Sequence, residues 1–358
     1  MNNKEVNNMK KILCSIVALC CTIVAGAQNE MVTAVLQHGD SETVYKGGTA
    51  FQQAYAAAVD NDVITLSSGT FKRLSSSIEK VLAIYGAGFE DDAATSTAIT
   101  AIDGDLYVGK ADATLDGIHI EGLCVRGNLN AANNTSSSTT AELKNFTLQK
   151  CYITGNLHFN SNIETVTVKQ CEIGSGIYGT NNNTASGLTI ANCYVWERIA
   201  GFSIDSRVHI DHCLTCRRYT SGRYSSDTYY FSQFLWTNSI LGNRSAYDGW
   251  GDNTIGEYST VKNCIVIGSS FNNTVISENC YINIALADVF NDGTDLNYSE
   301  DRTWKLKDEN TYVGTDGTPI GPYGGDGWNK VPATPVVKNL NATVNGANLG
   351  VSYEAIAR

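Results

Sequence analysis

The chain has 358 residues, and its 25 Lys and Arg against 36 Asp and Glu give a net charge of −11 at pH 7. An acidic surface repels the phosphates of nucleic acids, so we expect no nucleic-acid partner. A polyanionic ligand remains compatible with this charge, because screening over about 8 Å lets a local basic patch act on its own.

Residues 1–27 have the features of a secretory signal peptide. Two lysines precede an apolar run from Ile12 to Val24, and Ala25-Gly26-Ala27 offers a small-residue cleavage site. The run is shorter than the ~20 residues that span a bilayer. We therefore expect a secreted, periplasmic or outer cell-surface protein with no transmembrane segment after cleavage. An uncleaved anchor and lipoprotein processing at Cys20 or Cys21 are the alternatives.

A short helix is predicted after Gly47, with Thr49 as a candidate N-cap. Apolar residues follow at helical spacing, namely Phe51, Ala54, Tyr55, Ala58 and Val59. We expect this helix to cap the open end of a stack of strands, because exposed strand edges invite edge-to-edge pairing.

Strands are predicted to begin directly after this helix. Residues 62–71 form a first coil in this interpretation, and residues 78–88 form another, in which Val81, Ala83 and Tyr85 alternate. Residues 130–140 are rich in Ser, Thr and Asn and are predicted to form a protruding flexible loop.

The segment 187–196 carries a pattern that recurs along most of the chain. Leu188 and Ile190 alternate with polar residues, two positions interrupt the alternation, and Cys193 and Val195 resume it. If Cys193 is position zero, the other zero positions are Leu123, Cys151, Cys171, Cys213, Ser239, Cys264 and Cys280. Alternation by two predicts strands with one buried face, and repeats of roughly 16 to 28 residues fit coils of three short strands better than helical repeats.

The residues at and just before position zero are predicted to be structural. Cysteine at the inward zero position acts as a small apolar filler, and we expect a stack of thiols, with occasional disulfides between adjacent coils as the alternative. Asparagine precedes it in four coils, at Asn192, Asn238, Asn263 and Asn279. Asparagine tolerates the left-handed conformation of a tight bend, and a column of amides could hydrogen-bond from coil to coil.

On these repeats and bends the chain resembles the right-handed parallel β-helices of the pectate-lyase-like class, and within it the secreted β-helix proteins of Bacteroidetes-type bacteria. The resemblance covers roughly Tyr45 to Gly325. It implies an all-β fold, a single-stranded three-sheet solenoid with an N-terminal capping helix. We expect the solenoid with its caps over residues 28–330, including a closing loop that crosses the last coil, and a short β-rich tail over 331–358.

Counting five residues on from position zero brings Arg198, Arg218 and Arg244 into one column. Arginine forks match carboxylates and sulfates, so this column predicts binding of an acidic polysaccharide. The alternative is local pairing of the arginines with nearby carboxylates, namely Glu197, Asp205, Asp227, Asp248 and Asp252.

Aromatic and charged residues gather in the loops beside these arginines, which suggests a sugar-binding groove. They are Arg223, Tyr224, Asp227, Tyr230, Asp248 and Trp250. In the resembling lyases the groove runs along the first sheet and the turns after the third. Covering of hydrophobic coil edges is the alternative role for the aromatic residues.

Catalytic residues are harder to assign. His209 and Asp211 share a strand face and could form an acid/base pair, while Arg218, Arg244 and Tyr230 are the other weak candidates. The proline-containing arginine motif of pectate lyases is absent, because all four prolines follow residue 318.

We expect no cofactor and no metal site, with a bound calcium ion as the alternative. Two segments, 248–252 and 291–295, have calcium-like oxygen density without the full ligand spacing. The Cys213/Cys216 pair lacks the further ligands of a zinc site.

The sequence therefore predicts a secreted or surface protein that engages a polysaccharide, with a structural or adhesive spacer and a β-eliminating polysaccharide lyase as alternatives.

Overall fold

The computed structural model describes ten ranges of the chain and two backbone strands near its end. The ranges are 32–92, 97–132, 141–180, 183–203, 205–216, 234–242, 259–268, 271, 275–292 and 303–333, and the strands are 336–345 and 348–356. The predicted signal peptide, residues 1–27, lies outside them. Within these ranges, no helix is long and apolar enough to cross a membrane.

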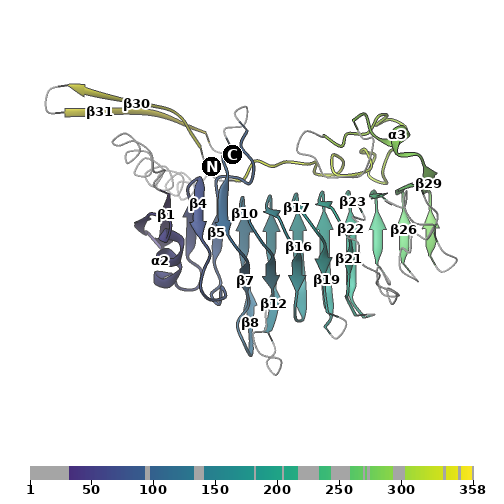
Figure 1. The fold of residues 1–358 in the computed structure, drawn as a ribbon, viewed down its shortest axis with the longest axis horizontal. Helices are drawn as coiled ribbons and strands as arrows, with labels where there is room; N and C mark the ends of the chain where they lie inside the picture. Colours follow the sequence, from purple (N-terminus) through teal and green to yellow (C-terminus); the bar gives the residue numbers. More distant parts are fainter. Residues whose placement is uncertain are drawn as a thin grey trace.

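Most of the strands belong to three sheets that run along the molecule (Figure 1). Sheet A has the order β2 (Ser41–Lys46), β1 (Thr33–His38), β3 (Val63–Leu66), β5 (Ala83–Tyr85), β9 (His119–Glu121), β13 (Thr147–Gln149), β16 (Ile163–Lys169), β19 (Ala185–Ala191), β22 (Arg207–Asp211), β24 (Leu235–Thr237), β26 (Thr260–Lys262), β28 (Ile276–Glu278). Beside this path, β12 (Ala141–Lys144) pairs with β16 and with β8 (Ala113–Asp116).

Sheets B and C are parallel throughout. Sheet B contains β4 (Gly69–Lys72), β6 (Thr100–Asp103), β10 (Cys124–Val125), β14 (Tyr152–Ile153), β17 (Glu172–Ile173), β20 (Tyr194–Val195), β23 (Leu214–Cys216), β25 (Ile240–Gly242), β27 (Ile265–Ile267), β29 (Tyr281–Ile284). Sheet C contains β7 (Leu106–Val108), β11 (Leu129–Ala131), β15 (Leu157–Phe159), β18 (Ile177–Tyr178), β21 (Ile199–Ala200).

Consecutive strands enter sheets A, B and C in turn. Thus β13, β14 and β15 follow one another along the chain, and each pairs in parallel with the corresponding strand of the next pass, β16, β17 or β18. The predicted all-β fold with parallel stacked strands is confirmed at this level, and the connectivity is compatible with a solenoid.

The zero positions fill the interior, as predicted. Cys151, Cys171, Cys193, Cys213 and Cys264 are buried, and all eight described cysteines are free thiols. Each of the five buried thiols at a zero position contacts the carbonyl oxygen two residues earlier in its own coil, as Cys193 Sγ does with Ala191 O at 3.1 Å. The cysteine column therefore serves as a polarizable filler between backbone groups of adjacent coils.

In one coil the alternating residues named from the sequence face outward. Val81, Ala83 and Tyr85 do alternate, but they lie on the outer side, and Leu82 and Ile84 fill the core. Because apolar residues occupy both faces of this segment, alternation alone did not distinguish them.

The N-terminal end is closed by more than the predicted helix. Helix α2 (Ala50–Ala57) buries Phe51 and Ala54, and Thr49 accepts a bond from the Gln53 side chain at 2.9 Å without capping a backbone N–H. In addition, β1 pairs antiparallel with β3. This hairpin with β2, which the sequence did not suggest, ends the parallel ladder of sheet A.

The bends between sheets A and B have the predicted left-handed conformation. Asn192, Asn238, Asn263 and Asn279 have φ between 49° and 51°. In place of the predicted amide ladder, Asn238 Nδ2 donates to Asp211 Oδ1 of the preceding coil at 2.9 Å, and Asn192 bonds to a distant segment. Asn192 Nδ2 donates to the carbonyl oxygens of Pro322 and Gly324 at 2.9 and 2.7 Å.

That segment, residues 303–333, is named the strap here. It follows the short helix α3 (Leu286–Val289) and runs back along the bends toward the N-terminal coils (Figure 1). Thr315 N donates to Asn238 Oδ1 at 2.8 Å, and Ala333 N donates to Glu121 Oε1 at 2.8 Å. The closing segment thus contacts many coils and is not confined to the last one.

The predicted β-rich tail is a hairpin. Strands β30 (Val336–Asn345) and β31 (Asn348–Ile356) pair antiparallel with each other. Figure 1 shows them extending away from the stack.

Candidate functional site

The outer face of sheet C carries a row of ring-bearing and amide side chains. Pairing places Tyr107, Asn130, His158 and Tyr178 at successive positions of one column. Their chain neighbours Leu157 and Ile177 point into the core, so alternation turns the column outward. We refer to this row, with Glu197 and Arg198, as the sheet C face.

Aromatic and charged groups touch one another on the sheet C face. The rings of His158 and Tyr178 stack with centroids 5.5 Å apart. Arg198 Nε donates to Tyr178 Oη at 3.3 Å, and Tyr178 Oη donates to Glu197 Oε2 at 3.2 Å. The Arg198 guanidinium also lies 5.8 Å from the centre of the Tyr178 ring, so Tyr178 is held from two sides.

A ladder of side-chain oxygens holds the turns that lead into sheet C. Asp105 Oδ1 accepts from Asn128 N at 2.7 Å, Asn128 Oδ1 accepts from Asn156 N at 2.8 Å, and Asn156 Oδ1 accepts from Gly176 N at 3.2 Å. Coil-to-coil asparagine bonding therefore exists, at a different turn from the predicted one.

Burial shifts the pKa values of His158 and Tyr178 on the sheet C face. Burial lowers the pKa of His158, and the charge of Asp105 opposes it. Burial raises the pKa of Tyr178, whereas the hydrogen bond from Arg198 and its positive charge act to lower it. Near neutral pH this face therefore presents a neutral imidazole and a phenol beside one guanidinium and one carboxylate.

A second set of polar groups lies on the outer face of sheet A. His209 Nε2 and Thr237 Oγ1 are 2.8 Å apart, and Thr237 Oγ1 donates to Asp211 Oδ1 at 2.6 Å. The single hydroxyl proton goes to Asp211, so His209 Nε2 is the donor to Thr237. The predicted pair is thus linked through a threonine, and the His209 nitrogen that faces Thr237 serves as a hydrogen-bond donor in this arrangement.

A buried carboxylate anchors another cluster on sheet A. Glu121 accepts from His119 Nε2 at 3.0 Å and lies 3.4 Å from Lys150 Nζ. Burial favours a higher pKa, but the bonds from His119 and the Ala333 N–H and the charge of Lys150 outweigh it and hold the pKa of Glu121 below its usual value. Because Glu121 also receives the strap, this cluster has a structural function.

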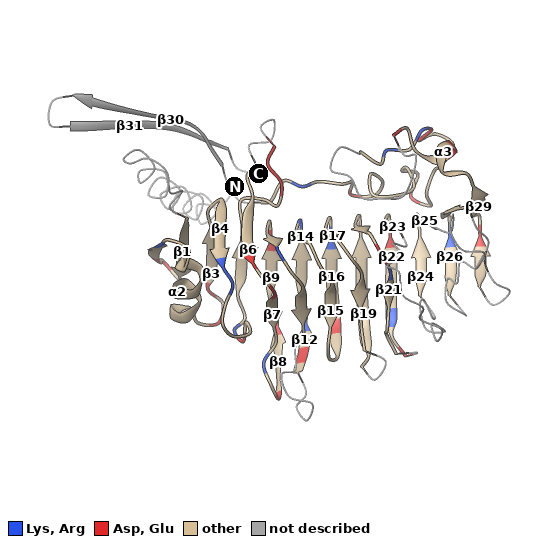
Figure 2. Cartoon of the chain, viewed as in Figure 1, with Lys and Arg blue, Asp and Glu red and all other residues tan. Residues whose placement is uncertain are grey.

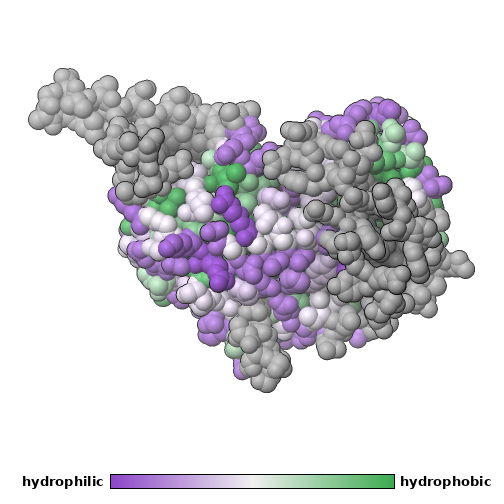
Figure 3. Space-filling model, viewed as in Figure 1, coloured by the Kyte–Doolittle hydropathy of each residue, from purple (hydrophilic) through white to green (hydrophobic). Residues whose placement is uncertain are grey.

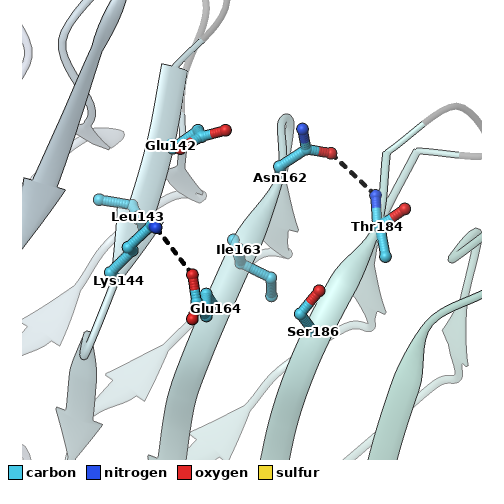
Figure 4. Close-up of a pocket in the computed structure, with 8 residues that line it drawn as sticks. All are labelled: Glu142, Leu143, Lys144, Asn162, Ile163, Glu164, Thr184 and Ser186. Atoms are coloured by element: carbon cyan, nitrogen blue, oxygen red, sulfur yellow. Dashed lines mark hydrogen bonds and ion pairs between the residues drawn. The ribbon is translucent and has the colours of Figure 1, made fainter.

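A small polar pocket opens between β12, β16 and β19 (Figure 4). Its volume is about 200 Å³, below the roughly 300–1,000 Å³ of ordinary small-molecule sites. Lys144 Nζ pairs with Glu164 Oε2 at 2.8 Å, and Thr184 N donates to Asn162 Oδ1 at 2.9 Å. Most of its polar groups bond to one another and are not available to a ligand. The open sheet C face is therefore the better candidate site.

The structure places two of the predicted site residues. Arg198 lies on the sheet C face and His209 on sheet A, so these two are on different faces. The remaining candidates lie outside the described residues, namely Arg218, Arg223, Tyr224, Asp227, Tyr230, Arg244, Asp248 and Trp250. Whether the three arginines form one column is therefore untested.

Sequence reasoning missed Tyr107, His158 and Tyr178. A signal for two of them was present, because His158 and Tyr178 lie seven residues after Cys151 and Cys171. Counting seven on from position zero, as well as five, would have found the outward column.

The calcium-like segment near Asp292 resembles an ordinary turn where it is described. Asp292 Oδ2 accepts from the backbone N–H and hydroxyl of Thr303 at 2.7 and 2.9 Å. Residues 293–295 and the segment 248–252 lie outside the described part. Among the described side chains, no group of three or more His, Cys, Asp or Glu could hold a metal ion.

Comparisons with family models, with curated proteins and with solved structures gave no match.

Proposed function

We propose that the chain is a secreted right-handed parallel β-helix of the pectate-lyase-like class that binds polysaccharide along the sheet C face. Handedness and class rest on the repeat pattern and on the resemblance, and secretion rests on the signal-peptide features of residues 1–27. The observation that carries the binding proposal is the contact of Arg198 and Glu197 with Tyr178, whose ring stacks on His158.

The chemistry of this face suits a sugar polymer. Aromatic rings pack on the apolar faces of pyranoses, while a guanidinium and a carboxylate can bond to hydroxyl groups. Successive coils lie about 4.8 Å apart, so the column offers repeated contacts along an extended chain. Acidic and basic residues are interspersed along the described coils (Figure 2). Attraction to an acidic sugar therefore rests on local groups, first of all Arg198.

Binding to a panel of acidic and neutral polysaccharides, measured by glycan array and calorimetry, tests the proposal. We expect Arg198→Ala to weaken binding of the acidic members tenfold or more, about 1.4 kcal/mol, and Tyr178→Ala to weaken acidic and neutral members alike. Arg207→Ala is the matched control, because Arg207 is an exposed arginine on sheet A; it should bind as the parent does.

Two outcomes would favour the alternatives. If no polysaccharide binds, or if both substitutions leave binding unchanged, a structural or adhesive spacer is the better account. Release of unsaturated products from an acidic polysaccharide, followed by ultraviolet absorbance, would instead indicate a lyase.

A further inference from the structure

The last coil of the stack differs from the interior coils in its exposure. Strands β28 and β29 end sheets A and B, and Ile276 and Ile282 are 64% and 40% exposed. On the face in Figure 3, hydrophilic residues cover much of the middle of the stack, and an apolar patch lies beside α3. An end coil has a neighbour on one side only, so it opens at a lower free energy than the interior.

Cys264 and Cys280 are the last two thiols of the cysteine column. Their chain neighbours Ile265 and Tyr281 pair directly in the parallel ladder of sheet B. Adjacent parallel strands lie about 4.8 Å apart, within the roughly 4.4–6.8 Å between Cα atoms that a disulfide accepts. The spacing of the two coils is therefore within the range that a disulfide can bridge.

The Cys264–Cys280 pair differs from the other neighbouring cysteines in its exposure to solvent. Cys151, Cys171, Cys193 and Cys213 are also on neighbouring coils, but each is fully buried, whereas Cys280 is partly exposed. Cys280 Sγ lies 3.4 Å from the carbonyl oxygens of Val261 and Glu278, so it sits against the preceding coil.

We propose that Cys264 and Cys280 are a disulfide-forming site that joins the last coil to the stack when the protein meets a low-molecular-weight disulfide. The Cys280 thiolate attacks one sulfur of that disulfide and expels one thiolate. The Cys264 thiol then loses its proton, and its sulfur displaces the second thiolate. Two protein thiols are oxidised and the reagent is reduced to two thiols.

The electrostatics of the pair support this order of attack. The hydrogen bond from the Cys264 side chain lowers the pKa of Cys280 to about 7, although burial opposes it. Burial holds the pKa of Cys264 well above its usual value. Cys280 is thus the nucleophile and Cys264 the resolving thiol.

The test exposes the full chain to oxidised glutathione and maps its cysteines by alkylation and peptide mass spectrometry. We expect the thiol count to fall by two, with one Cys264–Cys280 cross-linked peptide. We also expect hydrogen exchange over residues 276–284 to slow by about tenfold or more, because a cross-link restricts the open state.

Substitutions within the same column provide the controls. Serine already occupies this column at Ser239, which is fully buried, so Cys280→Ser and Cys264→Ser keep a side chain that the stack accepts. Cys280→Ser should prevent thiol loss, Cys264→Ser should leave a glutathione adduct on Cys280, and Cys171→Ser should leave the cross-link intact. Full retention of thiols in the parent, a stable adduct on Cys280 in the parent, or a disulfide between other cysteines would overturn the proposal.

Discussion

His212 shows how one side chain of the bend column takes part in holding the strap. It adopts a left-handed φ of 47°, is 2% exposed, and its Nε2 lies 3.1 Å from Asp316 Oδ2. Strap residue Gly325, with φ +56°, packs so closely that an added Cβ would lie 2.6 Å from the imidazole. The imidazole is therefore enclosed by the strap and loses its water.

Acidification should loosen the strap through His212. Burial lowers its pKa, and the facing carboxylates of Asp211, Asp316 and Asp326 oppose that shift, while His209 adds to it. The folded pKa lies below the free value of about 6.5, so the closed state binds fewer protons than the open state. The stability that His212 contributes to the closed strap is fully present above about pH 6.5. It is lost as the pH falls through the pKa of His212 in the folded protein.

Hydrogen exchange of residues 314–327 at a series of pH values, corrected for intrinsic rates, measures this loss. His212→Asn is the matched variant, because asparagine occupies the same bend at Asn192 and Asn238 with the same backbone conformation. In this variant, the free energy of opening the strap should not depend on pH between about 5 and 7. An unchanged pH profile in the variant would show that another group is responsible.

The strap supplies the bends with hydrogen bonds that water would make if the bends were exposed. Asn192 is buried and satisfies two strap carbonyl oxygens. Gln170 Nε2 bonds to Gly327 O at 2.7 Å, and Lys169 Nζ lies 2.5 Å from Asp326 Oδ2. Because these contacts join residues more than a hundred positions apart, they tie many coils to one segment and resist local opening.

Asn192→Gly separates the two functions of the asparagine. Glycine keeps the positive φ but removes the amide, which leaves two strap carbonyl oxygens without that donor. We expect the free energy of unfolding to fall by about 1–3 kcal/mol and hydrogen exchange in residues 321–327 to become faster. Asn263→Gly is the control, since Asn263 has a similar φ, 49° against 51° for Asn192, and its side chain makes no bond to the strap among the described residues. Equal effects of both substitutions would mean that the amide contributes nothing.

The sequence predicted strands and bends well because both depend on local chemistry. Leu188 and Ile190 must alternate inward, and Asn192 must tolerate a left-handed bend, whatever lies elsewhere in the chain. The strap contacts could not be predicted, because local patterns carry no information on which distant carbonyl oxygen meets Asn192. Of the sheet C face only Arg198 was predicted. The offset of seven residues from position zero that His158 and Tyr178 share is visible in the sequence, but the contact of Tyr178 with Arg198 depends on how the next coil folds back beside it.

For the whole molecule, stability is a sum over neighbouring coils, so the ends are the weak points. The N-terminal end is covered by α2 and by the β1–β2 hairpin. Phe51 is fully buried in this cap. The cap therefore has two effects: it contributes apolar burial, and it covers the edge strands that would otherwise pair with another copy.

Comparing Phe51→Ala with Phe159→Ala distinguishes these effects. Both phenylalanines are almost fully buried, at 0% and 1% exposure, so each truncation should cost about 3–5 kcal/mol and lower the Tm. Phe159 lies in the middle of the stack on β15, and its loss should leave the protein monomeric. Phe51→Ala should also speed hydrogen exchange in β3 and β4 and produce larger species whose proportion rises with concentration in sedimentation experiments. If both variants remain monomeric, or if both associate equally, the cap acts only through burial, and the N-terminal edge needs no cover.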